Sequence, residues 1–186
     1  MKIVSIFVAL FILGSCSPEK APRLCSREID RKVEKLISQM TLREKLGQLS
    51  QTNYWGDTIA DKYKNAIRKG EVGSFLNTEN IHIINELQRI AIEESRLHIP
   101  LIFGRDVIHG YRTVFPIQIG MTCSWNPALV QEATRIAARE ARADGYQWAF
   151  APMLDVTRNP RWGRVAESCG EDPYLGAQMA RALVHG

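Results

Sequence analysis

The sequence lacks the features that identify several classes of protein. None of its four cysteines forms a Cys-x-x-Cys pair, which argues against a zinc site or a thioredoxin-type redox motif. Basic residues never occur in a run longer than two, and the net charge is only +4, so we do not expect a nucleic-acid partner. No internal repeat or low-complexity tract is present. With 45% hydrophobic and 24% charged residues over 186 positions, the composition is that of a globular protein and excludes collagen-like or disordered chains.

A membrane-spanning apolar run is also missing. The apolar stretch over residues 3–13 is too short to cross a bilayer as a helix, which takes about 20 apolar residues. Lys2 precedes this stretch and small residues follow it, and this order is typical of a secretory signal. The pattern therefore predicts an exported protein with a signal peptide over residues 1–15.

The end of this signal resembles a bacterial lipobox. In Leu13-Gly14-Ser15-Cys16, the cysteine would be acylated and become the new amino terminus. We expect a lipoprotein of the bacterial cell envelope, periplasmic or anchored in the outer membrane, with residues 16–29 as a polar tether. The alternative is a plain signal peptide with an incidental cysteine. An oxidising envelope permits one disulfide, but nothing selects a pair among the other cysteines, Cys25, Cys123 and Cys169.

Helical periodicity alternates with short apolar runs through the rest of the chain. Amphipathic helices are expected near residues 33–40, 42–49, 59–67, 81–91, 127–144 and 173–183. Buried strands are expected over residues 72–76, 101–103 and 148–156. This alternation predicts an α/β protein, here the first part of a (β/α) TIM-like barrel over residues 30–186. Three parallel strands would leave an open edge, so we expect a truncated domain whose partner is the remainder of the same polypeptide.

Three of these helices carry clear start signals. Thr41 and Glu44 form a capping-box pattern, and the helix that follows is expected to bury Leu42, Leu46 and Leu49. The dipeptides Asn126-Pro127 and Asp172-Pro173 each place a capping side chain before a proline at the first helical position.

Polar loops follow the last two predicted strands, where barrel enzymes place their working residues. Asp106 and the arginines beyond Asp155 could give and accept hydrogen bonds to a sugar, and Trp162 could cover its ring. Other roles stay open. Asp106 could cap a loop or, with His109, bind a metal, although no second His/Asp pair supports this. Arg158 and Arg161 could belong to a structural ion-pair cluster, and Trp162 could belong to the core.

The same loops carry a resemblance. The chain resembles the N-terminal part of a family 3 glycoside hydrolase of the bacterial periplasmic β-glucosidase type. The matching segments are QMTLREKLGQL (39–49), GEVGSFLN (70–77), IPLIFGRDVIHGYRTVFPIQIG (99–120) and FAPMLDVTRNPRWGRVAESCGEDPYL (150–175). The resemblance implies a (β/α) barrel and retaining hydrolysis of terminal β-linked sugars, with neither a cofactor nor a metal.

The resemblance also implies roles for individual residues. Asp106 matches the carboxylate that grips hydroxyls of the sugar, Arg164 matches an arginine that binds the same sugar, and Arg112 matches a pocket residue of some members. Support of the loop is implied for Asp155, Glu167 and Glu171. The family's nucleophilic Asp and acid/base Glu match nothing here and are expected beyond Gly186, so this chain alone is expected to be inactive. The alternative is a non-catalytic, lipid-anchored sugar-binding protein.

Overall fold

The computed structural model describes residues 27–186. The predicted signal peptide, Cys16 and Cys25 lie outside the described residues. The chain divides into two compact units, residues 1–39 and 40–186. In the first unit the structure describes helix α1 (Arg27–Gln39), so residues 27–29 of the predicted tether are helical.

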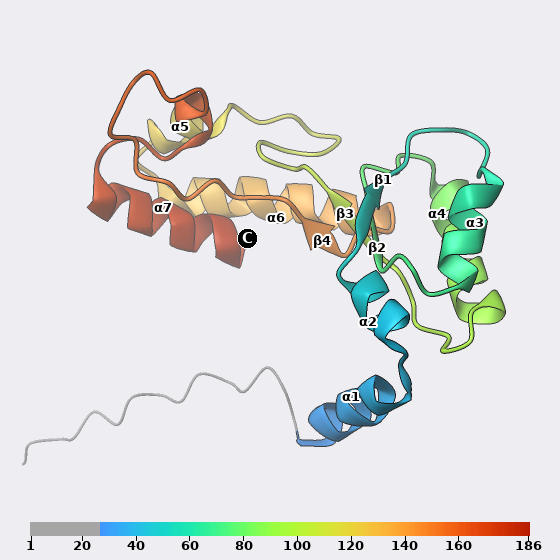
Figure 1. The fold of residues 1–186 in the computed structure, drawn as a ribbon. Helices are drawn as coiled ribbons and strands as arrows, with labels where there is room; N and C mark the ends of the chain where they lie inside the picture. Colours follow the sequence, from blue (N-terminus) through green and yellow to red (C-terminus); the bar gives the residue numbers. More distant parts are fainter. Residues whose placement is uncertain (1–26) are drawn as a thin grey trace, which may run out of the picture. The chain divides into compact units, whose positions relative to one another are not determined.

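The second unit alternates strands and helices along the chain (Figure 1). Its elements are α2 (Leu42–Gln48), β1 (Gln51–Asn53), α3 (Asp61–Arg68), β2 (Ser74–Leu76), α4 (Ile81–Arg89), the π-helix η1 (Ile90–Glu94), β3 (Ile102–Arg105), α5 (Gln118–Thr122), α6 (Pro127–Ala143), β4 (Trp148–Ala149), the 3-10 helix η2 (Val165–Glu167) and α7 (Pro173–His185). None of the helices within residues 27–186 is long and apolar enough to span a bilayer.

The strands form a parallel sheet in which each strand pairs with the one before it in the chain. The order is β1-β2-β3-β4, and the register aligns Phe75 with Phe103 and Gly104 with Trp148. Sequential order without a reversal is the topology of a (β/α) barrel, whereas a doubly wound sheet reverses its strand order. The predicted α/β fold with a barrel-like parallel sheet is confirmed.

Two details of the strands differ from the sequence-based expectation. Strand β1 was not predicted, because Gln51–Asn53 is polar and has no run of apolar residues. The predicted strand over residues 148–156 pairs only at Trp148 and Ala149, and residues 150–159 have no regular structure. Ile102 is 47% exposed, so β3 is not buried on both faces in this structure.

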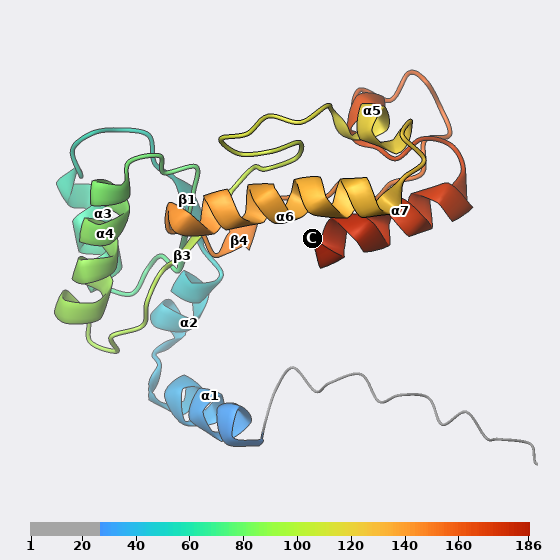
Figure 2. The same ribbon diagram turned by 180° about the vertical axis from the view of Figure 1, so that it is seen from behind.

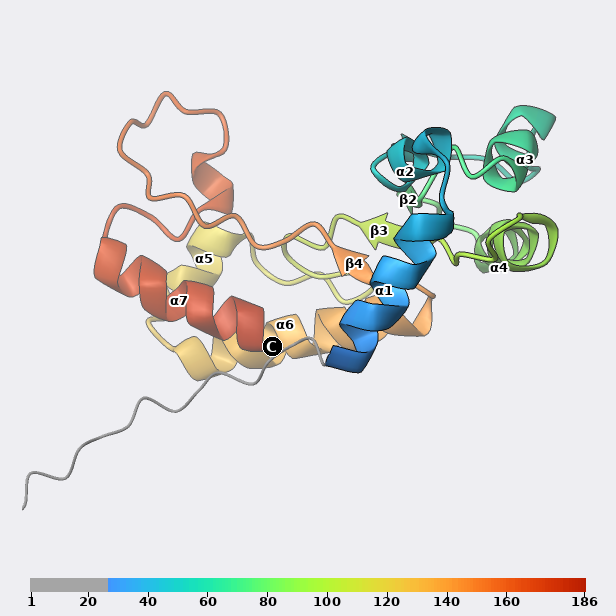
Figure 3. The ribbon, with the colours of Figure 1, turned by 60° about the horizontal axis from the view of Figure 1, so that its bottom comes forward.

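The main core lies between the sheet and helices α3 and α4, which lie side by side (Figure 3). Phe75 and Phe103 are fully buried, and their rings stack with centroids 6.0 Å apart. Tyr63 of α3 packs edge-on against Phe75, and Leu87 of α4 is fully buried in the same cluster. This core fixes the positions of β2 and β3, whose carboxyl ends carry the candidate site.

Helices α6 and α7 pack along each other and form a second core (Figure 2). Val130, Met179 and Leu183 are buried there together with Cys169. Both helices begin where the sequence predicts. Asn126 caps α6 by accepting from the Leu129 N–H, and Asp172 caps α7 in the same way.

Helix α2 begins at the predicted capping box, but it buries a different face. The Thr41 hydroxyl accepts from the Glu44 N–H, and the Glu44 carboxylate accepts from the Thr41 N–H. Glu44 and Gly47 are the buried residues of α2. The expected burial was wrong for Leu42, Leu46 and Leu49, which are 73%, 58% and 84% exposed. The helix approaches the turn at Gly70 so closely that only a glycine fits at position 47.

Candidate functional site

A polar cleft of about 480 Å³ opens at the carboxyl ends of β1, β2 and β3. Carboxyl ends of neighbouring parallel strands meet at one edge, so the residues that follow each strand come together there. The lining residues are Trp55, Gly56 and Asp57 after β1, Asn77, Glu79 and Asn80 after β2, and Arg105 and Asp106 at the end of β3. Carboxylates, amides and one exposed indole form the surface that a polyhydroxylated ligand requires.

Asp106 is exposed at this cleft and is held by Asn77. The Asn77 Nδ2 group donates to Oδ2 of Asp106 at 3.2 Å, and the Asp106 backbone N–H donates to Oδ1 of Asn77 at 3.4 Å. Asp106 therefore presents its carboxylate to the cleft from a defined position. Its alternative role as a helix or loop cap is not seen within the described residues, where no backbone N–H donates to its side chain.

The loop between β2 and α4 is anchored at each of its residues. The Asn77 N–H donates to the Gly104 carbonyl of β3 at 2.9 Å, and the Thr78 carbonyl accepts from the Tyr146 hydroxyl. Glu79 forms an ion pair with Arg105 at 2.9 Å. Asn80 caps α4, because its Oδ1 accepts from the N–H of His82. The floor of the cleft is therefore held in place by contacts within the chain.

Arg164 lies in the long loop after β4 and forms an ion pair with Glu167. The hydrogen bond that Arg164 donates to Glu167 is the main reason why the pKa of Arg164 is raised, and the negative charges of Asp106 and Asp155 raise it further. Arg164 thus lies within electrostatic reach of both carboxylates. Among the carboxylates of this loop, Glu167 is the one that pairs with Arg164.

Arg112 lies elsewhere, against the end of α6. Its guanidinium pairs with Asp144, with Nη2 2.7 Å from Oδ1, and the Tyr111 hydroxyl donates to the same carboxylate at 2.8 Å. The Arg112 hydrogen bond is the main cause of the lowered pKa of Asp144. Burial and the bond to Asp144 raise the pKa of Tyr111 well above its usual value. The structure does not place Arg112 among the residues that line the cleft with Asp106.

The other residues considered from the sequence do not line the cleft. Arg158 and Arg161 form no ion pair with any described residue, so the expected ion-pair cluster consists of Arg164 and Glu167 instead. Trp162 is half-buried, and the His109 ring is bonded to the Phe115 carbonyl of its own loop. Within residues 27–186, no three His, Cys, Asp or Glu side chains gather as a metal site would need. Two cysteines of the described residues are free thiols, the exposed Cys123 and the buried Cys169.

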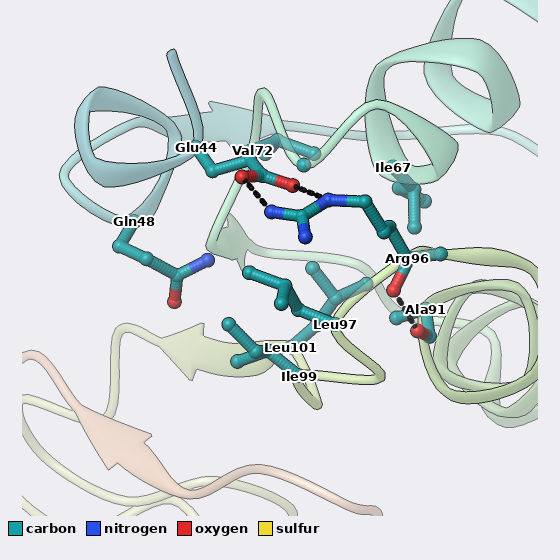
Figure 4. A pocket seen from close by; sticks show the side chains of 11 residues that line it. Glu44, Gln48, Ile67, Val72, Ala91, Arg96, Leu97, Ile99 and Leu101 are labelled. Carbon is teal, nitrogen blue, oxygen red and sulfur yellow. Dashed lines mark hydrogen bonds and ion pairs between the residues drawn. The ribbon is translucent and has the colours of Figure 1, made fainter. Parts of the chain in front are cut away.

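A second cavity lies at the opposite end of the strands and is too small for a ligand (Figure 4). It holds about 20 Å³, which is room for about one water molecule. Glu44 of α2 meets the Arg96 guanidinium there, with Oε2 2.5 Å from Nη2 and Oε1 3.0 Å from Nε. This pairing, helped by the Thr41 N–H, lowers the pKa of Glu44 to about 2. The cavity is closed by an ion pair and apolar side chains, which points to a role in stability at this end of the strands.

The fold and the cleft define a barrel-type α/β domain with a carbohydrate-compatible mouth. The chain belongs to the glycosyl hydrolase family 3 N-terminal domain family, whose model matches residues 41–186. It is 42% identical to a periplasmic β-glucosidase of Salmonella typhimurium over 155 residues, which cover 83% of this chain and 20% of that protein. The chain thus spans about a fifth of that relative's length.

Solved structures agree with this membership. A β-glucosidase from Listeria innocua in complex with isofagomine is 39% identical, with a TM-score of 0.74, over 87% of this chain and 23% of that one. A family 3 β-N-acetylglucosaminidase from Paenibacillus is 26% identical, with a TM-score of 0.68, over 78% of this chain and 30% of that one. The expected family and fold are therefore confirmed.

Of the residues predicted from the sequence to bind the sugar, Asp106 lines the cleft and Arg164 does not, and the residues around Asp106 were not predicted. Trp55 and Asp57 follow a strand that was not predicted, so nothing marked them as neighbours of Asp106. Asn77 follows a predicted strand directly, and that position was the available signal.

Proposed function

We propose that this chain forms the sugar-holding part of a retaining β-glycosidase that releases terminal, non-reducing β-D-glucosyl residues from oligosaccharides or glucosides. The observation that carries the proposal is the Asp106 carboxylate, fixed at the mouth of a polar cleft on a family 3 barrel domain. A carboxylate can accept from two neighbouring hydroxyls of one sugar while a guanidinium donates to a third. The names of the relatives from Salmonella and Listeria support glucose as the sugar.

Retaining hydrolysis needs two carboxyl groups about 5–5.5 Å apart, one a nucleophile and one a general acid/base. We assign neither role to a residue of this chain. Asp106 binds the sugar and holds it against the nucleophile, and the nucleophilic Asp and the acid/base Glu lie beyond Gly186. The chemistry requires no cofactor and no metal.

The two arginines contribute to the same sugar in different ways. Arg164 directs Nε and Nη2 to Glu167, so the Nη1 side of its planar guanidinium is the part that can donate to a hydroxyl. Arg112 can reach the sugar only after its ion pair with Asp144 opens. We therefore expect Arg164 to affect sugar binding more strongly than Arg112.

The test is the Asp106→Ala substitution in the complete polypeptide that the gene encodes. Hydrogen bonds to a charged group contribute about 1.5–3 kcal/mol each, and each 1.4 kcal/mol is a factor of about ten in rate. With two hydroxyls bound, kcat/KM on 4-nitrophenyl β-D-glucopyranoside should fall at least about 100-fold. Asp61→Asn, on the exposed start of α3, is the control and should not change kcat/KM. Unchanged activity of Asp106→Ala would refute the role assigned to Asp106. If the unsubstituted protein cleaves the corresponding xyloside or N-acetylglucosaminide faster than the glucoside, glucose is not the preferred sugar.

We also propose that the protein is a lipoprotein of the bacterial cell envelope, with Cys16 acylated after removal of residues 1–15. The periplasmic relative from Salmonella supports export, and the lipobox-like Leu13–Cys16 supports the anchor. Several acyl chains together anchor a protein stably. Cys16→Ser should therefore move the protein from the membrane fraction to the soluble fraction and abolish incorporation of labelled palmitate. Cys123→Ser is the control, and label that persists in Cys16→Ser would contradict the proposal.

A further inference from the structure

We infer that Asn77 is a positioning residue for Asp106: its carboxamide sets the direction in which the Asp106 carboxylate meets a sugar. This inference rests on the proposed function, because the task of Asp106 is taken from it. The carboxamide makes two contacts with the same residue, from Nδ2 to the carboxylate and from the Asp106 N–H to Oδ1. Backbone and side chain of Asp106 are thus tied to one planar group, which restricts rotation of the carboxylate.

Asn77 can act in this way because its own backbone is held. Its φ is +59°, in the left-handed region that Asn adopts more readily than most non-glycine residues. In that conformation the Asn77 N–H reaches the Gly104 carbonyl on β3, the strand that Asp106 directly follows. The next residue, Thr78, is 2% exposed and is tied through its carbonyl to Tyr146. The carboxamide therefore projects from a turn fixed on both sides.

The chemistry of the amide suits a carboxylate that must accept hydroxyl hydrogens. An amide N–H donor occupies one lone-pair position on Oδ2 of Asp106 and leaves Oδ1 and the remaining positions for a ligand. Being neutral, the amide also adds no charge that would compete with sugar hydroxyls. A carboxylate at position 77 would have the same shape but would repel Asp106 unless a proton lay between the two groups.

Two substitutions at position 77 distinguish the contribution of the carboxamide from that of the turn conformation. Asn77→Gly keeps a residue that adopts positive φ without cost but removes the carboxamide. Asn77→Asp keeps the size of the side chain and the turn but replaces the amide donor by an acceptor. Asp tolerates the left-handed region as Asn does. This variant therefore tests the inference even if Asn77→Gly is unstable. Asn85→Asp on the exposed face of α4 is the matched control for one added negative charge.

The readout is kcat/KM on 4-nitrophenyl β-D-glucopyranoside between pH 4.5 and 7.5, relative to the unsubstituted protein at each pH. We expect Asn77→Gly to be about tenfold lower at every pH. Asn77→Asp should be close to unsubstituted at pH 4.5, where one shared proton bridges the two carboxyl groups, and at least tenfold lower at pH 7.5, where both are ionised. The kcat/KM of Asn85→Asp should equal that of the unsubstituted protein at every pH.

A ratio for Asn77→Asp that does not fall with pH overturns the inference, because a merely structural role would lower activity equally at all pH values. Full activity of Asn77→Gly also overturns it. Asp106→Ala distinguishes this failure from failure of the proposed function. If Asp106→Ala abolishes activity and the Asn77 variants do not lower it, only the positioning role of Asn77 is wrong. If Asp106→Ala is fully active, the sugar-binding role itself is wrong.

Discussion

Gly47→Ala tests the packing of α2 against the rest of the unit. In an ordinary helix this substitution stabilises by about 0.5–1 kcal/mol, because glycine loses more backbone entropy on folding than alanine does. Here a Cβ at position 47 would lie 1.9 Å from the Gly70 carbonyl oxygen and 2.9 Å from the Glu71 carbonyl carbon. Both neighbours are backbone atoms, so no side chain can rotate away, and α2 or the turn at Gly70 must move by more than 1 Å.

Overpacking of this kind costs about 1–3 kcal/mol and at times more. Since the clash is with backbone, we expect the upper end, and a net loss of about 2 kcal/mol after the helix propensity is subtracted. For a domain of 150–250 residues, 1 kcal/mol shifts Tm by about 2–4 °C. The Tm of Gly47→Ala should therefore be about 4–8 °C below that of the unsubstituted protein. Gly163→Ala is the control, because a Cβ there meets nothing within 4 Å. A Tm for Gly47→Ala at or above that of the unsubstituted protein would refute the packing argument.

Two further predictions concern stability. Glu44→Gln should lower the free energy of unfolding at pH 7, because the Arg96 pairing holds the pKa of Glu44 at about 2 in the folded state, below its usual value of 4.5. A lowered folded pKa stabilises above the unfolded pKa and is lost as pH falls, so urea unfolding should show the difference shrinking between pH 4.5 and 2. A difference independent of pH, or an equal effect of Glu34→Gln, would contradict this. Tyr146→Phe leaves the Thr78 carbonyl without its partner and should cost about 1–3 kcal/mol; an unchanged urea midpoint would show that the bond contributes nothing.

Local start signals were the most predictable part of the fold. Asn126 and Asp172 cap α6 and α7 as expected, since a capping side chain followed by proline acts within one turn of the helix. Burial was less predictable. Leu42 and its apolar neighbours in α2 suggested an apolar buried face, but the face toward the sheet is set by the close approach of Gly47 to a turn far along the chain.

The candidate site was predictable only where a charged residue follows an apolar strand. Asp106 comes three residues after the apolar run Leu101–Phe103 and directly after β3, so its place at the sheet edge followed from the topology. The contact from Asn77 did not, because it depends on a left-handed backbone conformation and on the pairing of β2 with β3. Arg112 differs from Asp106 in this respect. The family resemblance implied a place in the pocket, whereas in this structure Asp144 at the end of α6 holds its guanidinium.

The sequential strand order has a consequence for how this domain assembles. From β2 to β4, each strand pairs with the strand that precedes it in the chain, and only the one or two helices between them must fold in the interval. A growing chain can therefore add one strand–helix unit at a time to an edge that already exists, without waiting for a distant segment to return. In this fold the amino-terminal units act as the template for the later ones. A substitution that disturbs β1 or β2 should then delay every later addition, whereas one in α7 should leave the pairing of β1 to β4 unaffected.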